Sequence, residues 1–281
     1  FTISGFEGAL TGACTSPVAT STIDASAARV FASFTAGGGM GLAEMTGSPN
    51  MVIVPDPCTF RVLPWEPKVG WVLGEEYFTS GAPFHFSVRH LLRRVLARLA
   101  GRGIKSIVGL EVEWYLYRLA DAELADENIG GLGVKGKPRR VLPAEPGFFV
   151  HGESNLDRVH APLAALAEAL ERLGLPLRSI EKELGPGQIE CTFAPCEALE
   201  AADNLALFRA ATRQVLGRMG YLASFMCRPG FRGHPSSGWH LHQSLADAKT
   251  GRNLFAPTAA KAPLAPLGMH YLGGLLEHAL A

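Results

Sequence analysis

The clearest alternation of hydrophobic and polar residues lies between Ile107 and Leu116, and it predicts a β-strand. One face of this strand would carry only apolar side chains, namely Leu110, Val112, Trp114 and Leu116. The other face would carry Gly109, Glu111, Glu113 and Tyr115. The first face is typical of a hydrophobic core. The second places two carboxylates at adjacent positions, where they repel each other unless they share a proton or a cation or face bulk water.

Helical spacing of apolar residues follows Ser87, which can cap a helix that ends at Gly101. Residues 156–173 and 197–219 also fit helices, and both favour packing against a core. The first of them has a stripe of leucines, namely Leu163, Leu166, Leu170 and Leu173. Strands are expected near 106–117, 187–193, 221–227 and 238–245. This mixture predicts an α+β domain over residues 84–281 whose sheet gathers the carboxylates on its polar face.

Residues 1–83 have a different composition, rich in Gly, Ser, Thr and Pro. Their β-type runs are short, such as Met51–Val54 and Trp71–Leu73. We therefore expect a small β-rich domain over residues 1–83 that precedes the larger one.

The overall composition excludes some classes of partner. The 26 basic and 26 acidic residues balance, which gives no indication of a nucleic-acid or membrane partner. No apolar run is long enough to span a membrane, and from the residues after Phe1 we expect no signal peptide. The five cysteines are scattered without a C-x2-C pair, which favours reduced, buried thiols in a cytoplasmic protein. Because the first residue is not Met, we expect the chain to be trimmed at its front.

Candidate chemistry is densest in the segment Gly238–Leu245. If this segment is a strand, His240, His242 and Ser244 share one face. Imidazole is a common metal ligand and can also contact a phosphate. A lone H-x-H is more often a solvated strand face. The motif therefore indicates a site only in combination with the other polar segments of the chain.

The third polar segment runs from Glu183 to Glu190 and has a Gly-Pro-Gly turn between its two carboxylates. After the turn, Gln188, Glu190 and Thr192 would share a strand face. Taken together, the three segments offer four carboxylates and a histidine. Such an oxygen-rich set suits Mg²⁺ or Mn²⁺ better than a metal that prefers thiolates.

These motifs, in this order, resemble glutamine synthetase and its gamma-glutamyl-amine ligase relatives. The resemblance covers most of the chain, and its motifs are Val54-Pro55-Asp56, Leu63-Pro64-Trp65, Glu111-x-Glu113, Glu183-x-Gly-Pro-Gly-Gln-x-Glu190, Phe225-Met-x-Arg-Pro229 and Ser237-Gly-x-His-x-His-x-Ser-Leu245. It implies a β-grasp-like domain at the N-terminus, followed by a glutamine synthetase-type catalytic domain with an antiparallel sheet and flanking helices.

The resemblance also implies roles for individual residues. Glu113, Glu183 and Glu190 would hold one divalent ion, and Glu111 and His240 would hold a second ion that bridges the phosphates of ATP. His242 and Ser244 would line the ATP side, and Gly238 and Asn50 would contact substrate. The implied reaction activates a carboxylate as an acyl phosphate, which an amine then attacks. This chemistry needs no covalent nucleophile, and we assign none.

Departures from the family pattern bear on the substrate. Pro235-Ser236 replaces the Asn-Gly with which the family grips glutamate, and Asn50 stands where glutamine synthetases carry an Asp. The Asp-Gly-Ser-Ser that helps to bind ammonium is also missing. A site without negative charge there should bind NH₄⁺ poorly and admit a bulkier amine. Relative to the family pattern, the chain also stops before the C-terminal part, which carries phosphate-binding arginines and a last metal-ligating Glu.

The favoured function is therefore an ATP-dependent carboxylate–amine ligase that joins glutamate to an amine other than ammonia. The resemblance implies a homo-oligomeric ring in which Asn50 of one subunit lies near His240 and Glu113 of its neighbour. A non-catalytic structural or regulatory homologue is the alternative, and the missing C-terminal part supports it. Retention of the five metal ligands argues against it. A guanidino kinase is weaker still, because the Gly-Pro-Gly-Gln and His-x-His motifs disfavour it.

Overall fold

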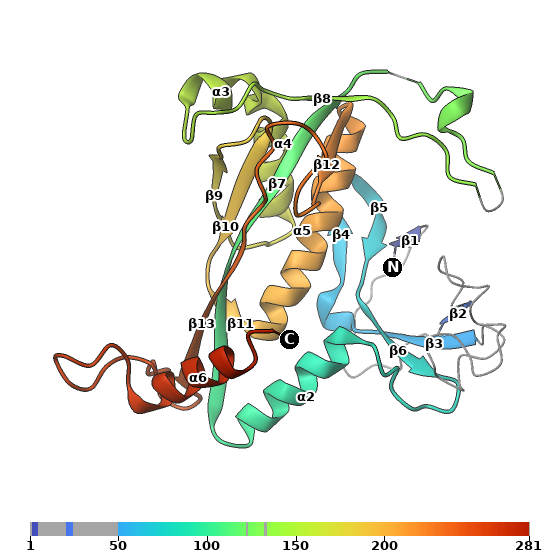
Figure 1. The fold of residues 1–281 in the computed structure, drawn as a ribbon. Coiled ribbons are helices and arrows are strands. Elements are labelled where there is room, and N and C mark those ends of the chain that lie inside the picture. The colour runs from blue at the N-terminus through green and yellow to red at the C-terminus, as the bar shows by residue number, and fades with distance from the viewer. Residues whose placement is uncertain (1, 5–20, 25–49, 122, 132–133, 281) are drawn as a thin grey trace. The chain divides into compact units, whose positions relative to one another are not determined.

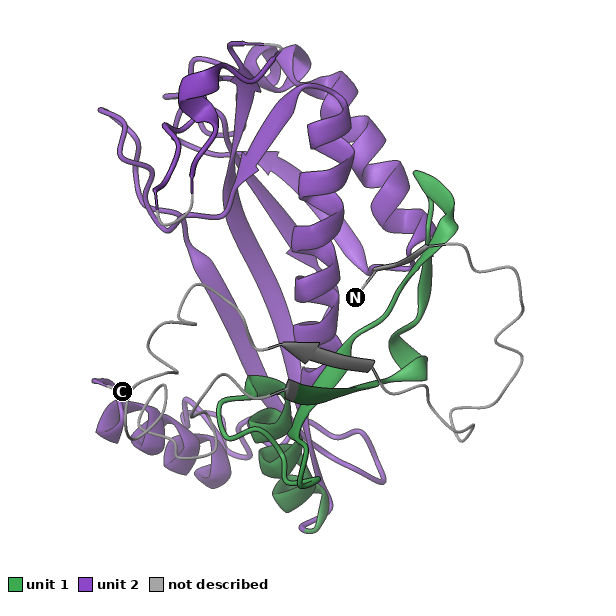
Figure 2. Ribbon diagram, turned by 90° about the vertical axis from the view of Figure 1, so that its right-hand side faces the viewer, with its two compact units in different colours: residues 1–101 green, residues 102–281 purple. Residues whose placement is uncertain are grey.

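The structure is a computed structural model, which describes all residues of the chain except 1, 5–20, 25–49, 122, 132–133 and 281. The chain divides into two compact units, Phe1–Gly101 and Arg102–Ala281, which Figure 2 colours separately. The helix after residue 84 therefore groups with the first unit. The sequence-based boundary between residues 83 and 84 stays a prediction.

Unit 1 contains two three-stranded antiparallel sheets. In the first, the order β1-β5-β4 joins Thr2–Ser4, Glu66–Trp71 and Arg61–Leu63. In the second, the order β2-β3-β6 joins Ser21–Asp24, Asn50–Pro55 and Gly74–Phe78. The predicted run Met51–Val54 is confirmed as part of β3, whereas only Trp71 of the run Trp71–Leu73 lies in a strand. The β-grasp arrangement of this unit stays a prediction.

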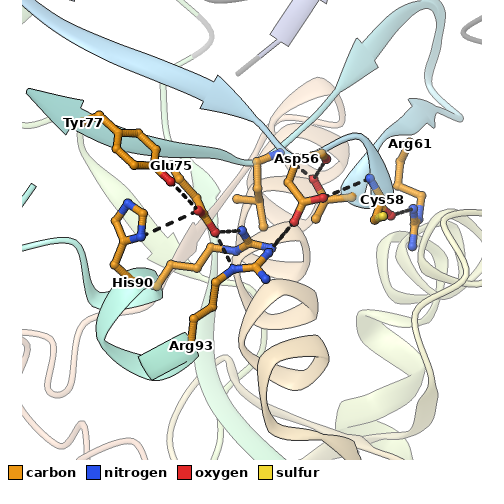
Figure 3. Close-up of polar contacts among 10 residues, drawn as sticks. Asp56, Cys58, Arg61, Glu75, Tyr77, His90 and Arg93 are labelled. Atoms are coloured by element: carbon orange, nitrogen blue, oxygen red, sulfur yellow. Dashed lines mark hydrogen bonds and ion pairs between the residues drawn. The ribbon is translucent and has the colours of Figure 1, made fainter. Parts of the chain in front are cut away.

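Helix α2 (Val88–Ala100) follows Ser87 as predicted, although the Ser87 side chain makes no capping hydrogen bond. Two arginines one turn apart tie this helix to the loop after β3 and to β6. Arg89 lies 2.8 Å from Asp56 and 2.5 Å from Glu75. Arg93 contacts the same two carboxylates at 2.7 and 2.5 Å. Figure 3 shows this arginine–carboxylate cluster, in which each charge has two partners of opposite sign.

Unit 2 is built on one long strand, β7 (Ile104–Leu119), at the centre of a seven-stranded antiparallel sheet. Along one edge of β7 lie β11 (Cys196–Glu197), β10 (Gln188–Phe193) and β8 (Val141–Pro143). Along the other edge lie β13 (Trp239–Asp247) and β12 (Tyr221–Ser224). Strand β9 (Leu177–Lys182) pairs with the outer edge of β10. Figure 1 shows β7 running between β10 and β13.

Helices cover one face of this sheet. Helix α4 (His160–Arg172) packs on β9, and α5 (Ala198–Arg218) packs on β7 and β12 (Figure 1). The predicted apolar face of β7 lies in this core, with Val112, Trp114 and Leu116 at most 1% exposed. The predicted leucine stripe of α4 is likewise buried. The opposite face of β7, which carries the carboxylates, is free of both helices and so remains available for chemistry.

Three predictions of secondary structure need correction. The helix expected over 156–173 is two helices, α3 (Glu153–Arg158) and α4, which meet at Val159. The cause is Pro162, because its ring would clash with the carbonyl of Arg158 in a continuous helix. Strand β12 ends at Ser224 rather than at 227. Strand β9 and helix α6 (Pro266–Glu277) were not predicted, and the three glycines inside α6 explain its weak signal.

The cysteines are not all reduced as predicted. Cys191, Cys196 and Cys227 are free, and of these only Cys191 is fully buried. Cys58 is disulfide-bonded. Among the described residues, no helix is both long enough and apolar enough to cross a bilayer.

The arginine–carboxylate cluster predicts how α2 is stabilised. In Arg89→Met, Asp56 and Glu75 would each lose one of their two arginine partners, so we expect the α2 amides to lose protection from hydrogen exchange about 10-fold. Arg98→Met is the matched control, because Arg98 lies on the same helix and is exposed. Equal protection of α2 in Arg89→Met and Arg98→Met would contradict the assignment.

The same cluster predicts a dependence on pH. Burial acts to raise the pKa of Asp56, but hydrogen bonds from Arg89 and the Cys58 amide, with the charges of both arginines, lower it overall from 3.8. A lowered carboxyl pKa stabilises the fold at neutral pH, and this contribution is lost as the pH falls through the folded-state value. The protection of α2 in the unsubstituted chain should therefore fall below about pH 4, and the Asp56→Asn variant should show less of this acid dependence.

Candidate functional site

The register of β7 places the predicted polar residues of three strands side by side. Glu113 is paired with Glu190 of β10, and Glu111 is paired with His240 of β13. Paired residues on antiparallel strands point to the same face with closely spaced Cβ atoms. The alternation of β7, the Gly-Pro-Gly turn and the His-x-His motif therefore converge on one face of the sheet, as the sequence predicts.

A further carboxylate lies in the same row. Glu190 is also paired with Glu181 of β9, so that Glu181, Glu190 and Glu113 follow one another across three strands. Glu181 accepts a hydrogen bond from Ser179 at 2.6 Å and lies 3.1 Å from the His151 ring. Sequence reasoning missed Glu181. Its position two residues before Glu183 was the available signal, but strand β9 itself was not recognised.

Glu111 is held between two imidazoles. One carboxylate oxygen lies 2.9 Å from Nδ1 of His240, and the other lies 3.0 Å from Nε2 of His242. The hydrogen bond with His240 is the main reason that the pKa of Glu111 is lowered and that of His240 is raised. The contact of His242 with Glu111 was not anticipated, because the pattern had placed His242 on the ATP side only.

Glu190 occupies the most crowded position. Its burial raises its pKa to about 7, and a hydrogen bond with Glu183 and the charges of Glu183, Glu111 and Glu113 add to the shift. The structure thus brings all four carboxylates predicted from the sequence into one electrostatic group. One ligand atom each of Glu111, Glu190 and His240 lies within 4.8 Å of the others. We call Glu111, Glu113, Glu183, Glu190 and His240 the carboxylate cluster.

Glu113 is oriented from both sides of β7. Gln188 donates to its carboxylate at 2.5 Å. Its backbone amide donates to Gly238 at 3.0 Å, and the Trp239 indole donates to its carbonyl at 3.1 Å. A Cβ atom on Gly238 would lie only 2.6 Å from the His240 ring and 2.7 Å from the Glu113 carboxylate. A methyl group at 238 would therefore displace one or both of these side chains.

The cluster fits a divalent cation. Four carboxylates on one half-buried face repel each other, and burial together with the neighbouring carboxylates raises the pKa of Glu190 to about 7. A hard cation would offset this charge and take ligands from carboxylate oxygens and an imidazole, a donor set that suits Mg²⁺ or Mn²⁺. Glu190 was predicted to share one ion with Glu113 and Glu183. It also lies close to Glu111 and His240, the predicted ligands of the second ion, so the geometry does not divide the residues between two ions.

The other predicted site residues lie around the cluster or outside the description. Ser244 donates to Asn253 at 3.0 Å, farther along β13. The carbonyl of Ser236 accepts a hydrogen bond from Gln188, and that of Pro235 accepts one from Tyr115. The segment that replaces the family's Asn-Gly is therefore directly beside the cluster. Asn50 begins β3 in unit 1, and its side chain is outside the described residues.

Comparison with known proteins establishes the family. Residues 85–281 match the family described as glutamine synthetase, catalytic domain. The chain belongs to this family. Two similar proteins are a gamma-glutamylanilide synthase from Acinetobacter, 43% identical over 90% of this chain, and a glutamate–methylamine ligase from Methyloversatilis universalis, 30% identical over 86%. The chain spans 51% of the length of each.

A solved structure described as "GmaS/ADP complex-Conformation 1" has the same fold. It superposes with a TM-score of 0.67 at 29% sequence identity, over 82% of this chain and 49% of that one. The α+β prediction with a glutamine synthetase-type antiparallel sheet is therefore confirmed for the larger domain.

Gly238→Ala tests the geometry of this glutamine synthetase-type site. The added methyl group would displace His240 and Glu113, so we expect Mn²⁺ affinity to fall by about 10-fold or more while the far-ultraviolet circular dichroism stays the same. Titration calorimetry with Mn²⁺ measures this, and Gly230→Ala is the control, because a Cβ atom there would meet nothing within 4 Å. Unchanged Mn²⁺ affinity in Gly238→Ala would contradict the placement of His240 and Glu113.

Proposed function

We propose that the complete protein that carries this chain is an ATP-dependent ligase, which joins an amine other than ammonia to the γ-carboxylate of glutamate through an acyl phosphate. The observation that carries the proposal is the carboxylate cluster, four acidic groups and a histidine on the helix-free face of a glutamine synthetase-type sheet. Two relatives are described as a gamma-glutamylanilide synthase and a glutamate–methylamine ligase, which supports an amine as the second substrate.

In this proposal Glu113, Glu183 and Glu190 would hold one Mg²⁺ or Mn²⁺ ion, and Glu111 and His240 would hold a second. Such ions would supply positive charge against the phosphates of ATP during phosphoryl transfer to the substrate carboxylate. Gln188 fixes the Glu113 carboxylate by its hydrogen bond, and His242 contacts the Glu111 oxygen that His240 leaves free. His242 and Ser244 line the ATP side. The residues supply position and electrostatic field rather than a covalent nucleophile.

The preference for an amine larger than ammonia has support in unit 2. Residues 148–150 run beside the strand that leads to Glu183, with hydrogen bonds from the Phe148 amide to the Leu184 carbonyl and from the His151 amide to the Lys182 carbonyl. This segment exposes Phe148, Phe149 and Val150. Exposed apolar side chains on a segment whose backbone bonds to both neighbours of Glu183 suit the alkyl or aryl part of an amine better than a bare ammonium ion. The uncharged Asn50 agrees with this choice.

We further propose a homo-oligomeric ring, in which Asn50 of one subunit faces the carboxylate cluster of its neighbour. The support is the family membership together with the substrate role that Asn50 has by resemblance. A cytoplasmic location fits an enzyme that consumes ATP and glutamate. The partners in this proposal are small molecules and further copies of the same protein, with no nucleic acid and no membrane.

The substrate proposal is tested by ADP release from the complete gene product at saturating glutamate. We expect primary alkyl or aryl amines to support faster release than ammonium chloride, because an uncharged amine pocket gives no stabilisation to NH₄⁺. Preference for ammonia across the panel would refute the substrate assignment. Absence of ADP release with every amine would favour the non-catalytic homologue.

The carboxylate roles are tested by charge-neutral substitutions. Glu113→Gln and Glu190→Gln should each reduce ADP release by more than about 100-fold, since groups that merely orient metal ligands already cost about 10- to 100-fold. Glu197→Gln is the control, because Glu197 belongs to the same sheet but is 57% exposed and forms a surface ion pair with Lys105. Wild-type turnover in the first two variants would make these carboxylates ordinary surface groups.

A further inference from the structure

A buried ion pair lies at the turn between Glu183 and Gln188. Lys182, the last residue of β9, has its ammonium nitrogen 3.2 Å from the carboxylate of Glu145, and both side chains are 0% exposed. Sequence reasoning gave neither residue a role. Charges that are fully removed from water are rare and need specific partners.

Both charges are satisfied by the backbone around the Gly-Pro-Gly turn. The Lys182 ammonium group donates to the carbonyl of Glu183 and, at 2.9 Å, to that of Gly185. The Glu145 carboxylate accepts from the amide of Gly187. The ion pair thus forms hydrogen bonds along the whole turn, from Glu183 to Gly187. The other oxygen of Glu145 accepts from Gly147 at 2.7 Å, which attaches the loop after β8 to the same point.

The turn that the ion pair holds is packed against β7. Gly187 has a φ of +72°, a conformation that favours glycine, and its carbonyl accepts from the Leu116 amide at 2.7 Å. The Gln188 side chain is fixed within the turn, because its oxygen accepts from the Gly185 amide at 2.8 Å. Its nitrogen then donates to Glu113 at 2.5 Å. A continuous set of contacts therefore leads from Lys182 to the Glu113 carboxylate.

Stability alone does not explain such a pair. Apolar residues of similar volume can often replace a buried ion pair at no cost in stability, whereas removal of one partner leaves a buried charge uncompensated. An apolar replacement would lose the geometry of the turn. Only the charged groups hold the backbone of Glu183, Gly185 and Gly187 by hydrogen bonds. These segments carry Glu183, which belongs to the carboxylate cluster, and Gln188, which donates a hydrogen bond to Glu113 of that cluster.

We propose that Lys182 and Glu145 are positioning residues, which hold the Gly185–Gly187 turn so that Glu183 and Glu113 stand in place to bind a divalent cation. This inference rests on the proposed function, because that function assigns the cation to these carboxylates. Lys182 and Glu145 themselves contact neither the ion nor the substrates.

The test compares two paired substitutions in the complete gene product, with Mn²⁺ as the probe. Lys182→Met with Glu145→Gln removes both buried charges together, so that neither is left unpaired. Lys105→Met with Glu197→Gln makes the same changes in a pair of the same sheet whose side chains are 48% and 57% exposed. The measurements are Mn²⁺ affinity by electron paramagnetic resonance, which reports free Mn²⁺, and the midpoint of thermal unfolding.

We expect Mn²⁺ affinity to fall about 10- to 100-fold in the buried-pair variant and to stay unchanged in the exposed-pair control. Lys182→Arg keeps the charge and the donors, so it should recover part of the lost affinity. A buried-pair variant that is folded and binds Mn²⁺ like the unsubstituted protein would overturn the inference.

If the buried-pair variant fails to fold, a variant that leaves the ion pair intact still tests the inference. Gln188→Met removes the hydrogen bond between the turn and Glu113, and it should lower Mn²⁺ affinity by a similar factor. Wild-type affinity in this variant would overturn the inference.

Failure of the proposed function and failure of the positioning role give different results. If the unsubstituted protein binds no Mn²⁺ at this site, both are wrong, whereas tight Mn²⁺ binding that survives every substitution of Lys182, Glu145 and Gln188 rejects only the positioning role.

Discussion

Repulsion among carboxylates on one face of a sheet is the constraint on which the site depends. Antiparallel pairing puts Glu181, Glu190 and Glu113 in one row, with Glu111 two residues along the same strand face. In a half-buried setting these charges cannot all be ionised without compensation. Two imidazoles contact Glu111 and an amide contacts Glu113, while burial and the neighbouring carboxylates raise the pKa of Glu190 to about 7. A divalent cation would offset the remaining charge, and that requirement gives the site its chemistry.

The rest of unit 2 holds β7 by strand pairing and packing. Strand β7 has neighbours along both edges, and its apolar side chains pack under α5, where Trp114, Phe208 and Phe225 form a continuous set of ring contacts. The carboxylates therefore project from a strand that is hydrogen-bonded to neighbours on both sides. The Lys182–Glu145 pair adds a second fixed point at the turn between β9 and β10.

The sequence predicts those parts of the site that repeat with the period of a strand. Alternation identified the two faces of β7, the Gly-Pro-Gly turn identified the bend before Gln188, and the His-x-His motif identified the face of β13. Residues whose role comes from pairing across strands were harder to find. Glu181 joins the row only through the register of β9, and the burial of Lys182 and Glu145 has no signature in a single sequence. The break at Val159 follows from Pro162, but the leucine stripe from Leu163 to Leu173 carries no mark of where its helix begins.

The most direct test of the account is anomalous X-ray diffraction from crystals of the complete gene product soaked in Mn²⁺. The account predicts strong anomalous peaks on the helix-free face of the sheet, within coordination distance of Glu190 and its neighbours Glu113 and Glu183, and of Glu111 and His240. Anomalous peaks only at other places, with these carboxylates in contact with solvent alone, would contradict it.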